Sequence, residues 1–403
     1  MPSYKIALIT TFPPGKGSLN EYAYHFVRYL RQKREVSELV LLVDYLPGKE
    51  QYPEFEKDGY APTRIVPCWD FDSKTNALRI LKAVRQEKPD VVILNLQFAS
   101  FGSGKVAAAL GLTTPALIRL SGFPVITLLH NIMETIDLKK AGFGGNPLLE
   151  KLIRVFGYIF TRLLLLSNLV AVTIPKYVEI LENKYKAKNV LLTPHGSFEE
   201  ASADPVFEPP PGPQRIMTFG KFGTYKKVEP LVEAYKILQA KNHHDMELVI
   251  AGTDSPNSPG YLESVKQTYS EVKSICFTGY VAEEDVPKVF GDASVVVFPY
   301  NSTTGSSGVL HQAGEYARAV VLPNIGDFAA LVAEEGFTGE FFEPDNTESL
   351  AQAIENILDN PIRRLEIASQ NFAAATGLPV SDVVDWYLLH IQTLVSKKPK
   401  AKR

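Results

Sequence analysis

Short apolar runs alternate with amphipathic helical patterns along almost the whole sequence. Such alternation is typical of βαβ units, in which helices join parallel strands. The chain has 403 residues, which is more than one hydrophobic core usually organises. The pattern therefore predicts an α/β protein built from two Rossmann-like halves. In the first half we predict strands at residues 5–10, 38–43, 91–94, 125–129, 169–172 and 190–192, and a helix at 20–33.

The alternation breaks once, at SFEEASADPVFEPPPGPQR (residues 197–215). Proline removes backbone donors and favours extended chain, so this segment is predicted to be a linker. We expect one domain at 1–196, the linker at 197–214 and a second domain at 215–379. The second domain is predicted to have strands at 215–219, 247–251, 275–278, 295–298, 320–322 and 340–342. Its helices are predicted at 228–241, 261–270, 307–316, 328–335 and 349–358, and a last helix is predicted at 381–395.

The composition limits the classes of function. A net charge of −3 argues against a nucleic-acid partner, since such proteins usually carry a strong basic excess. The two cysteines, Cys68 and Cys276, form no disulfide framework or zinc motif, and a reducing cytoplasm suits them. The first apolar run is short and is not followed by a cleavage site, so we predict no signal peptide.

An apolar stretch at residues 155–172 leaves two interpretations open. It lies largely in a predicted helix at 148–167 and holds Arg162 near its middle, which a membrane-spanning helix tolerates poorly. The first interpretation is a core helix. The second is a helix on the inner face of the plasma membrane, with Lys151, Arg154 and Arg162 near the headgroups and with help from the basic tail at 397–403.

The first candidate ligand site is the turn after the first strand. Gly15 and Gly17 allow close backbone approach, Ser18 adds a hydroxyl, and the helix that follows offers free N–H groups to a phosphate. The segment lacks the third glycine of a dinucleotide fingerprint. A flexible loop without a ligand is the alternative.

The second candidate site is FGKFGTYKK (residues 219–227), predicted as a loop after a strand. Lys221 and Lys226, next to Gly220, place two cations there, which is what a diphosphate leaving group requires. A lysine-rich surface loop is the alternative.

The third candidate site opens the helix predicted at 307–316. Small residues there form a cradle for an anion, namely Thr304, Gly305, Ser306, Ser307 and Gly308. Gln312 and Glu315 are three residues apart on one helix face, where we expect them to bond ribose hydroxyls. A helix cap with ordinary polar residues is the alternative.

The fourth candidate site follows the strand at 125–129. His130 and Asn131 stand at its carboxyl end, where ligands of parallel sheets bind, and His195 follows the strand at 190–192. The next segment, METIDLKKAGFGGN (residues 133–146), includes Glu134 and is a candidate for the acceptor side.

Together these segments resemble the GT-B glycosyltransferases, and among them glycosyltransferase family 4, most strongly at residues 215–360. Lys221 and Lys226 fall on the family's two basic residues for the donor diphosphate, with Lys221 where arginine is usual. Residues 304–313 fall on the Glu-x7-Glu motif without gaps, with Thr304 and Gln312 in place of the two glutamates. His130 matches the histidine near the donor sugar, and the helix at 380–396 would cross back to the first domain.

The resemblance implies transfer of a hexose-type sugar from a nucleoside-diphosphate sugar, with retention and without a metal or other cofactor. His130, Lys226 and Lys221 are then the candidate catalytic residues. Polysaccharide biosynthesis is the implied process, and the acceptor would be a glycan or a lipid-linked molecule, bound near Asn131 and Glu134. The rivals are a non-catalytic or partner-dependent nucleotide-sugar-binding subunit, which the loss of both glutamates favours, a GT-B-fold epimerase and, more distantly, a dinucleotide oxidoreductase.

Overall fold

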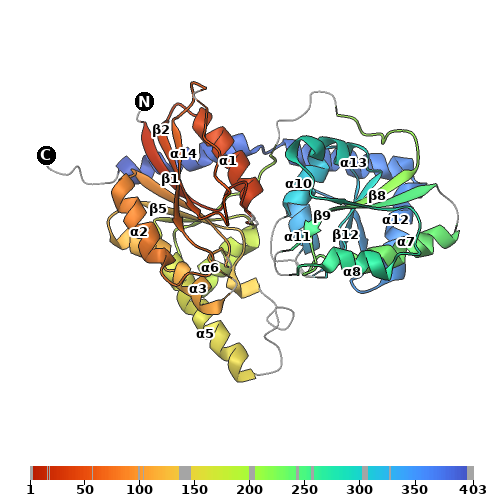
Figure 1. Ribbon diagram of the computed structural model, residues 1–403, viewed down its shortest axis with the longest axis horizontal. Coiled ribbons are helices and arrows are strands. Elements are labelled where there is room, and N and C mark those ends of the chain that lie inside the picture. Colours follow the sequence, from red (N-terminus) through yellow and green to blue (C-terminus); the bar gives the residue numbers. More distant parts are fainter. Residues whose placement is uncertain are drawn as a thin grey trace. The chain divides into compact units, whose positions relative to one another are not determined.

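The computed structural model describes residues 3–15, 17, 19–56, 58–98, 100–102, 104–135, 147–198, 205–241, 245–255, 258–301, 307–325 and 328–396. These residues form two compact units. Residues 3–195 and 380–396 make the first, and residues 196–301 and 307–379 make the second. Each unit holds one parallel sheet with helices packed against it (Figure 1).

The first unit contains a seven-stranded sheet in the order β3-β2-β1-β4-β5-β6-β7. Its strands are β1 Tyr4–Ile9, β2 Val36–Asp44, β3 Thr63–Trp69, β4 Val91–Leu96, β5 Val125–Leu129, β6 Leu169–Val172 and β7 Val190–Leu192. Every pairing is parallel. Strands buried on both faces need continuous apolar sequence, and β4, β5 and β6 are buried at every position.

The helices of the first unit cover that sheet. They are α1 Asn20–Gln32, α2 Asn76–Glu87, α3 Lys105–Gly111, α4 Thr114–Leu120, α5 Pro147–Leu164, α6 Pro175–Tyr185 and α14 Val380–Ser396, with a 3-10 turn η1 at Met133–Thr135. Helix α14 packs on α1, where the rings of Phe26 and Tyr387 meet edge to face at 5.2 Å. The last helix is thus part of the first unit.

The second unit contains a six-stranded sheet in the order β10-β9-β8-β11-β12-β13. Its strands are β8 Gln214–Phe222, β9 Met246–Asp254, β10 Ile275–Gly279, β11 Val295–Val297, β12 Val320–Pro323 and β13 Glu340–Phe342. Its helices are α7 Glu229–Lys241, α8 Tyr261–Thr268, α9 Val286–Gly291, α10 Gly308–Glu315, α11 Phe328–Glu334, α12 Thr347–Asp359 and α13 Pro361–Thr376, with a 3-10 turn η3 at Glu283–Asp285.

The segment predicted as a linker is held on the second unit where it is described. Ser197 bridges Pro379 in parallel, and the N–H of Phe198 donates to Glu315. Farther on, Arg318 donates to the carbonyl of Val206. These partners give an extended, proline-rich chain a fixed path, which the sequence alone did not predict.

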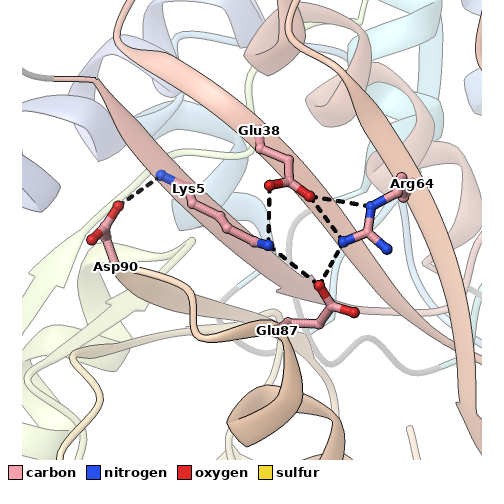
Figure 2. A network of polar contacts seen from close by, with 5 residues as sticks. All are labelled: Lys5, Glu38, Arg64, Glu87 and Asp90. Atoms are coloured by element: carbon pink, nitrogen blue, oxygen red, sulfur yellow. Dashed lines mark hydrogen bonds and ion pairs between the residues drawn. The ribbon is translucent and has the colours of Figure 1, made fainter.

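The amino-terminal edge of the first sheet is fixed by charged pairs (Figure 2). Lys5 of β1 lies 3.0 Å from Glu38 and 3.3 Å from Glu87, and Arg64 lies 2.9 and 2.6 Å from the same two carboxylates. The Asp90 carboxylate accepts from the Lys5 backbone N–H at 2.8 Å. Burial alone would raise the pKa of Glu38, but the bonds from Arg64 and Lys5 hold that pKa below its ordinary value. This edge is therefore structural, and the opposite, carboxyl edge carries the candidate ligand residues.

Candidate functional site

In the second unit the candidate residues gather where the strand order reverses. Strand β8 pairs with β9 on one side and β11 on the other. The chain builds the sheet outward from β8 through β9 and β10 on one side, and then through β11, β12 and β13 on the other. The loops at the carboxyl ends of such strands form the crevice in which ligands of open α/β sheets bind. Here the loop after β8 meets the loop after β11, through an antiparallel bridge between Lys226 and Tyr300.

The Lys226 side chain is held by aromatic rings and a glycine. Its Nζ lies 4.8 Å from the ring centroid of Tyr300 and 5.9 Å from that of Tyr225. It also lies 3.0 Å from the point that a Cβ on Gly220 would occupy, and Gly220 has a φ of 142°. A side chain at position 220 would therefore be strained and would push the ammonium group away.

Tyr300 connects Lys226 to the start of α10. The ring is buried, and the Ser307 side chain lies close enough to its hydroxyl to oppose the effect of burial on the Tyr300 pKa. Burial raises the pKa of Tyr300, so the hydroxyl stays protonated at neutral pH. Tyr300 was not predicted, although its place at the end of a buried strand beside a glycine-serine segment was a usable signal.

Lys221 does not lie in a loop as predicted. Strand β8 continues to Phe222, and Lys221 pairs with Thr253 of β9. The strand is longer than its apolar run because β9 also continues, to Asp254, and supplies backbone partners. Lys221 is exposed near the carboxyl end of its strand.

Helix α10 begins at Gly308, with Ser307 as the preceding residue. Thr304, Gly305 and Ser306 lie outside the described residues. Gln312 is buried, with 3% of its surface exposed. Glu315 accepts a hydrogen bond from the N–H of Phe198 through Oε1, so this carboxylate fixes the chain that enters the second unit. Its bond to a ribose stays a prediction.

The loop after β1 is ordered by its own contacts. The Gly15 N–H donates to the Phe12 carbonyl at 3.0 Å, and the Asn20 amide donates to the Gly15 carbonyl. A Cβ on Gly17 would stand 2.1 Å from the Thr11 hydroxyl oxygen. Gly17 is thus required for the loop to pack, a reason different from the expected approach of a ligand. Ser18 lies outside the described residues.

His130 sits at the carboxyl end of β5 in a polar cluster that is only partly exposed. Its Nε2 is 2.7 Å from Oδ1 of Asn95, and its ring meets those of Tyr22 at 4.9 Å and His195 at 6.0 Å, both edge to face. Burial, with a smaller effect of His195, lowers the pKa of His130 to about 3. The imidazole is therefore neutral at physiological pH. Asn95 and Tyr22 were not predicted, although an asparagine inside the apolar strand VVILNL is a signal for a buried polar role.

Asn131 and Glu134, predicted on the acceptor side, have partners within the first unit. Asn131 Oδ1 accepts from the Phe98 N–H at 3.1 Å. Glu134 lies 3.2 Å from Lys184 and accepts from the Tyr185 hydroxyl, and only 6% of its side chain is exposed. The rest of the segment, residues 136–146, lies outside the described residues.

Helix α5 buries one face and exposes another that is rich in apolar side chains. Gly157, Thr161 and Leu164 are buried, whereas Phe156 and Ile159 expose 50% and 45% of their surface. The buried face fits the core-helix interpretation, whereas the exposed face does not. None of the described helices combines the length and apolar character needed to cross a bilayer. The basic tail at 397–403 lies outside the described residues.

A match to a known family lies within the second unit. Residues 213–360 match the family described as glycosyl transferases group 1. An alpha-D-kanosaminyltransferase of Streptomyces kanamyceticus is 29% identical over 154 residues, and the chain spans about 38% of the length of that relative. The match covers 38% of this chain.

Solved structures match over nearly the whole chain. Sucrose-phosphate synthase of Thermosynechococcus elongatus has a TM-score of 0.74 at 17% identity, with 98% of this chain and 100% of that one covered. HepE of Anabaena, in complex with UDP-glucose, has a TM-score of 0.68 at 13% identity, with 97% and 100% covered. The chain therefore has the GT-B fold, as predicted: two Rossmann-like units, each with a parallel sheet.

Proposed function

We propose that this chain is a retaining glycosyltransferase that moves a hexose-type sugar from a nucleoside-diphosphate sugar to a glycan or lipid-linked acceptor. The observation that carries the proposal is the position of Lys226 at the topological switch point of the second unit, inside the segment that matches glycosyl transferases group 1. HepE of Anabaena, whose structure is similar, was solved in complex with UDP-glucose. This supports a nucleotide sugar as the donor.

In this proposal, the second unit binds the donor. The ammonium group of Lys226 neutralises the diphosphate as the sugar departs, because charge that develops on a leaving group is best stabilised by a fixed, preorganised cation. The N–H groups of Ser307 and Gly308, at the start of α10, add the positive end of a helix dipole. Lys221 contributes longer-range attraction from β8. These groups take the part that a metal ion has in other transferases.

Gln312 is the proposed partner of the ribose. It lies one turn into α10 and is buried, so its amide is preorganised for hydrogen bonds but carries no charge. Glu315, on the same helix, is proposed to bind a ribose hydroxyl as well, while Oε1 of its carboxylate accepts from the Phe198 N–H. His130 is proposed to bind the transferred sugar, and the loop with Gly15 and Gly17 is proposed to contribute to ligand binding within the first unit.

We also propose that α5 places the protein on a membrane surface, as a lipid-linked acceptor would require. Val155 and Ile159 are four residues apart and form an exposed apolar stripe, which Phe156 widens. The exposed basic residues Lys151, Arg154 and Arg162 border it. An apolar stripe with a basic border is the pattern of helices that lie in the interface of anionic bilayers.

The deciding experiment has three measurements on the full chain. Melting temperature is measured with UDP-, GDP-, ADP- and dTDP-sugars, and a true donor is expected to raise it because it binds only the folded state. Release of nucleoside diphosphate is then followed with and without glycan acceptors, and NMR of the product gives the anomeric configuration. Binding without any transfer or donor hydrolysis would instead identify a non-catalytic binding subunit, and sugar interconversion without an acceptor would identify an epimerase.

A further inference from the structure

Asn95 is a buried amide in the middle of an otherwise apolar strand. It belongs to β4, which lies between β1 and β5, and only 4% of its surface is exposed. The other five residues of the strand are all apolar and buried, namely Val91, Val92, Ile93, Leu94 and Leu96. An amide in such a position is costly unless its hydrogen bonds are made, so the bonds that Asn95 makes indicate why an amide is needed there.

The first bond fixes which way round the amide lies. The Thr10 hydroxyl donates its single hydrogen to the Thr11 carbonyl at 2.9 Å. Its lone pairs therefore face Asn95, whose Nδ2 lies 3.1 Å from Thr10 Oγ1 and donates to it. The reverse orientation would set the amide oxygen against an oxygen that has no hydrogen left to give.

The second bond then fixes the proton of His130. With Nδ2 directed at Thr10, Oδ1 of Asn95 is the atom that faces His130 Nε2, at 2.7 Å. A carbonyl oxygen only accepts, so Nε2 must carry the hydrogen and donate it. Nδ1 is left with its lone pair. Among the described residues, no donor lies within hydrogen-bond distance of Nδ1.

The surroundings of the ring keep it neutral. The groups that pack on it are Tyr22, from α1, and His195, from the segment after β7. Neither brings a negative charge at neutral pH that would stabilise an imidazolium ion. His130 is nevertheless partly accessible at the carboxyl edge of the sheet, so a ligand can reach it.

We propose that Asn95 is a positioning residue that holds His130 in the tautomer with a bare Nδ1, so that His130 accepts a hydrogen bond from a hydroxyl group of its ligand. Thr10 is the residue that orients Asn95. The identification of that hydroxyl as one on the transferred sugar rests on the proposed function. A lone pair at this position attracts a hydroxyl donor and repels phosphate and carboxylate oxygens, which separates the sugar-binding end of a donor from its diphosphate end.

The test begins with a measurement that does not depend on activity. The protein is labelled with ¹⁵N-histidine, His130 is assigned by comparison with His130→Gln, and its ring is followed from about pH 5 to about pH 8, the range in which an ordinary histidine titrates. We expect a hydrogen on Nε2, a bare Nδ1 and no titration. A hydrogen on Nδ1, or a titration in this range, would overturn the assignment of Asn95.

Two variants test the hydrogen-bond chain. Asn95→Asp sets a carboxylate against Nε2, which favours the imidazolium ion, so His130 is expected to titrate within the same pH range. The rate of sugar transfer by Asn95→Asp is expected to fall at lower pH, because Nδ1 of His130 gains a hydrogen there. The rate of the wild type is expected to stay constant over the same pH range. Thr10→Val removes the acceptor that orients the amide and is expected to give a mixture of tautomers. An unchanged His130 spectrum in Asn95→Asp would refute the role.

The control is Asn189→Asp. It makes the same change in the same unit, at an amide that donates to the carbonyls of Leu165 and Ser167 at 3.0 and 2.7 Å and bonds no histidine. It is expected to lose stability without altering the His130 spectrum. If the wild-type spectrum is as expected but no nucleotide sugar is bound or turned over, then the proposed function fails while the role of Asn95 stands.

Discussion

The ammonium nitrogen of Lys226 lies 4.8 Å from the centre of the Tyr300 ring. Because the Tyr300 hydroxyl also lies close to the Ser307 side chain, one buried ring adjoins both the cation after β8 and the residue that precedes α10. In the proposed function, these two groups bind the donor diphosphate. A ring face attracts a cation without neutralising it, so Lys226 is held in place with its charge available to a ligand.

Replacing Lys226 by alanine is expected to weaken the binding of nucleoside diphosphate strongly. A hydrogen bond to a charged group contributes about 1.5–3 kcal/mol, which corresponds to a rise of about tenfold to 100-fold in Kd. Calorimetry with the diphosphate measures the change. The neighbouring Lys227 is exposed and serves as the matched control, since Lys227→Ala removes the same charge nearby. Equal affinity in wild type and Lys226→Ala would rule out the assigned role.

The contributions of the Tyr300 ring and of its hydroxyl to donor binding can be measured separately. Tyr300→Phe keeps the ring under the cation and loses the hydroxyl beside Ser307, whereas Tyr300→Leu loses both the aromatic ring and the hydroxyl. Since a cation–ring contact contributes about 0.5–2 kcal/mol, we expect the donor KM to rise modestly in the first variant and several-fold further in the second. The melting temperature of each variant separates lost packing from lost binding. Equal KM values for the two variants would contradict a role for the ring.

Gly220→Ala is expected to impair donor binding through the displacement of Lys226. The added methyl group would meet Lys226 Nζ at 3.0 Å, and the long side chain can move aside at little cost to the fold. Gly212 provides the control, because its φ of 138° imposes similar backbone strain with no atom within 4 Å of the added methyl. We expect both variants to lose some stability, measured by thermal melting, but only Gly220→Ala to lose affinity for nucleoside diphosphate. Equal losses of affinity would refute the steric argument.

The sequence predicted those parts of the fold that depend on local pattern. Strands β5, β6, β7 and β13 have the predicted bounds, since each is a short apolar run between turn residues. Strand β3, Thr63–Trp69, was missed. It contains Pro67, which an inner strand would exclude, but β3 is an edge strand and needs partners on one side only.

The parts that failed depend on residues distant in sequence. Lys221 was predicted in a loop because Gly220 ends the apolar run, yet the strand continues along β9. The bond between Asn95 and His130 joins residues 35 positions apart on neighbouring strands, so it required the strand order. Glu315 shares a helix with Gln312 as predicted, but its partner is the backbone of Phe198, which no periodicity indicates.

The exposed face of α5 predicts binding to anionic vesicles. Replacing Val155 and Ile159 together by aspartate removes the apolar stripe and adds negative charge, so affinity for vesicles that contain an anionic phospholipid is expected to fall at least about tenfold. Leu78, an exposed apolar residue of α2, provides the control variant Leu78→Asp. Arg154→Glu is expected to reduce the preference for anionic over neutral vesicles, at about 1 kcal/mol per basic residue. Sedimentation with vesicles measures both effects, and no binding by the wild type would refute the membrane proposal.

The neutral His130 predicts how stability depends on pH. Its pKa is about 3 in the folded protein against an ordinary value of 6.5, so between these values the unfolded chain binds a proton that the folded chain does not. Stability from this residue is therefore full above about pH 6.5 and is lost as the pH falls, by up to about 1.4 kcal/mol per pH unit. His130→Gln is expected to flatten the fall in the free energy of unfolding between about pH 7 and about pH 5, measured by denaturant titration. Burial also lowers the pKa of His390 on α14, but less strongly than that of His130, so His390→Gln is expected to change the slope less. If His130→Gln keeps the wild-type slope, the imidazole is not held neutral, because a histidine that binds its proton equally in both states contributes nothing to this dependence.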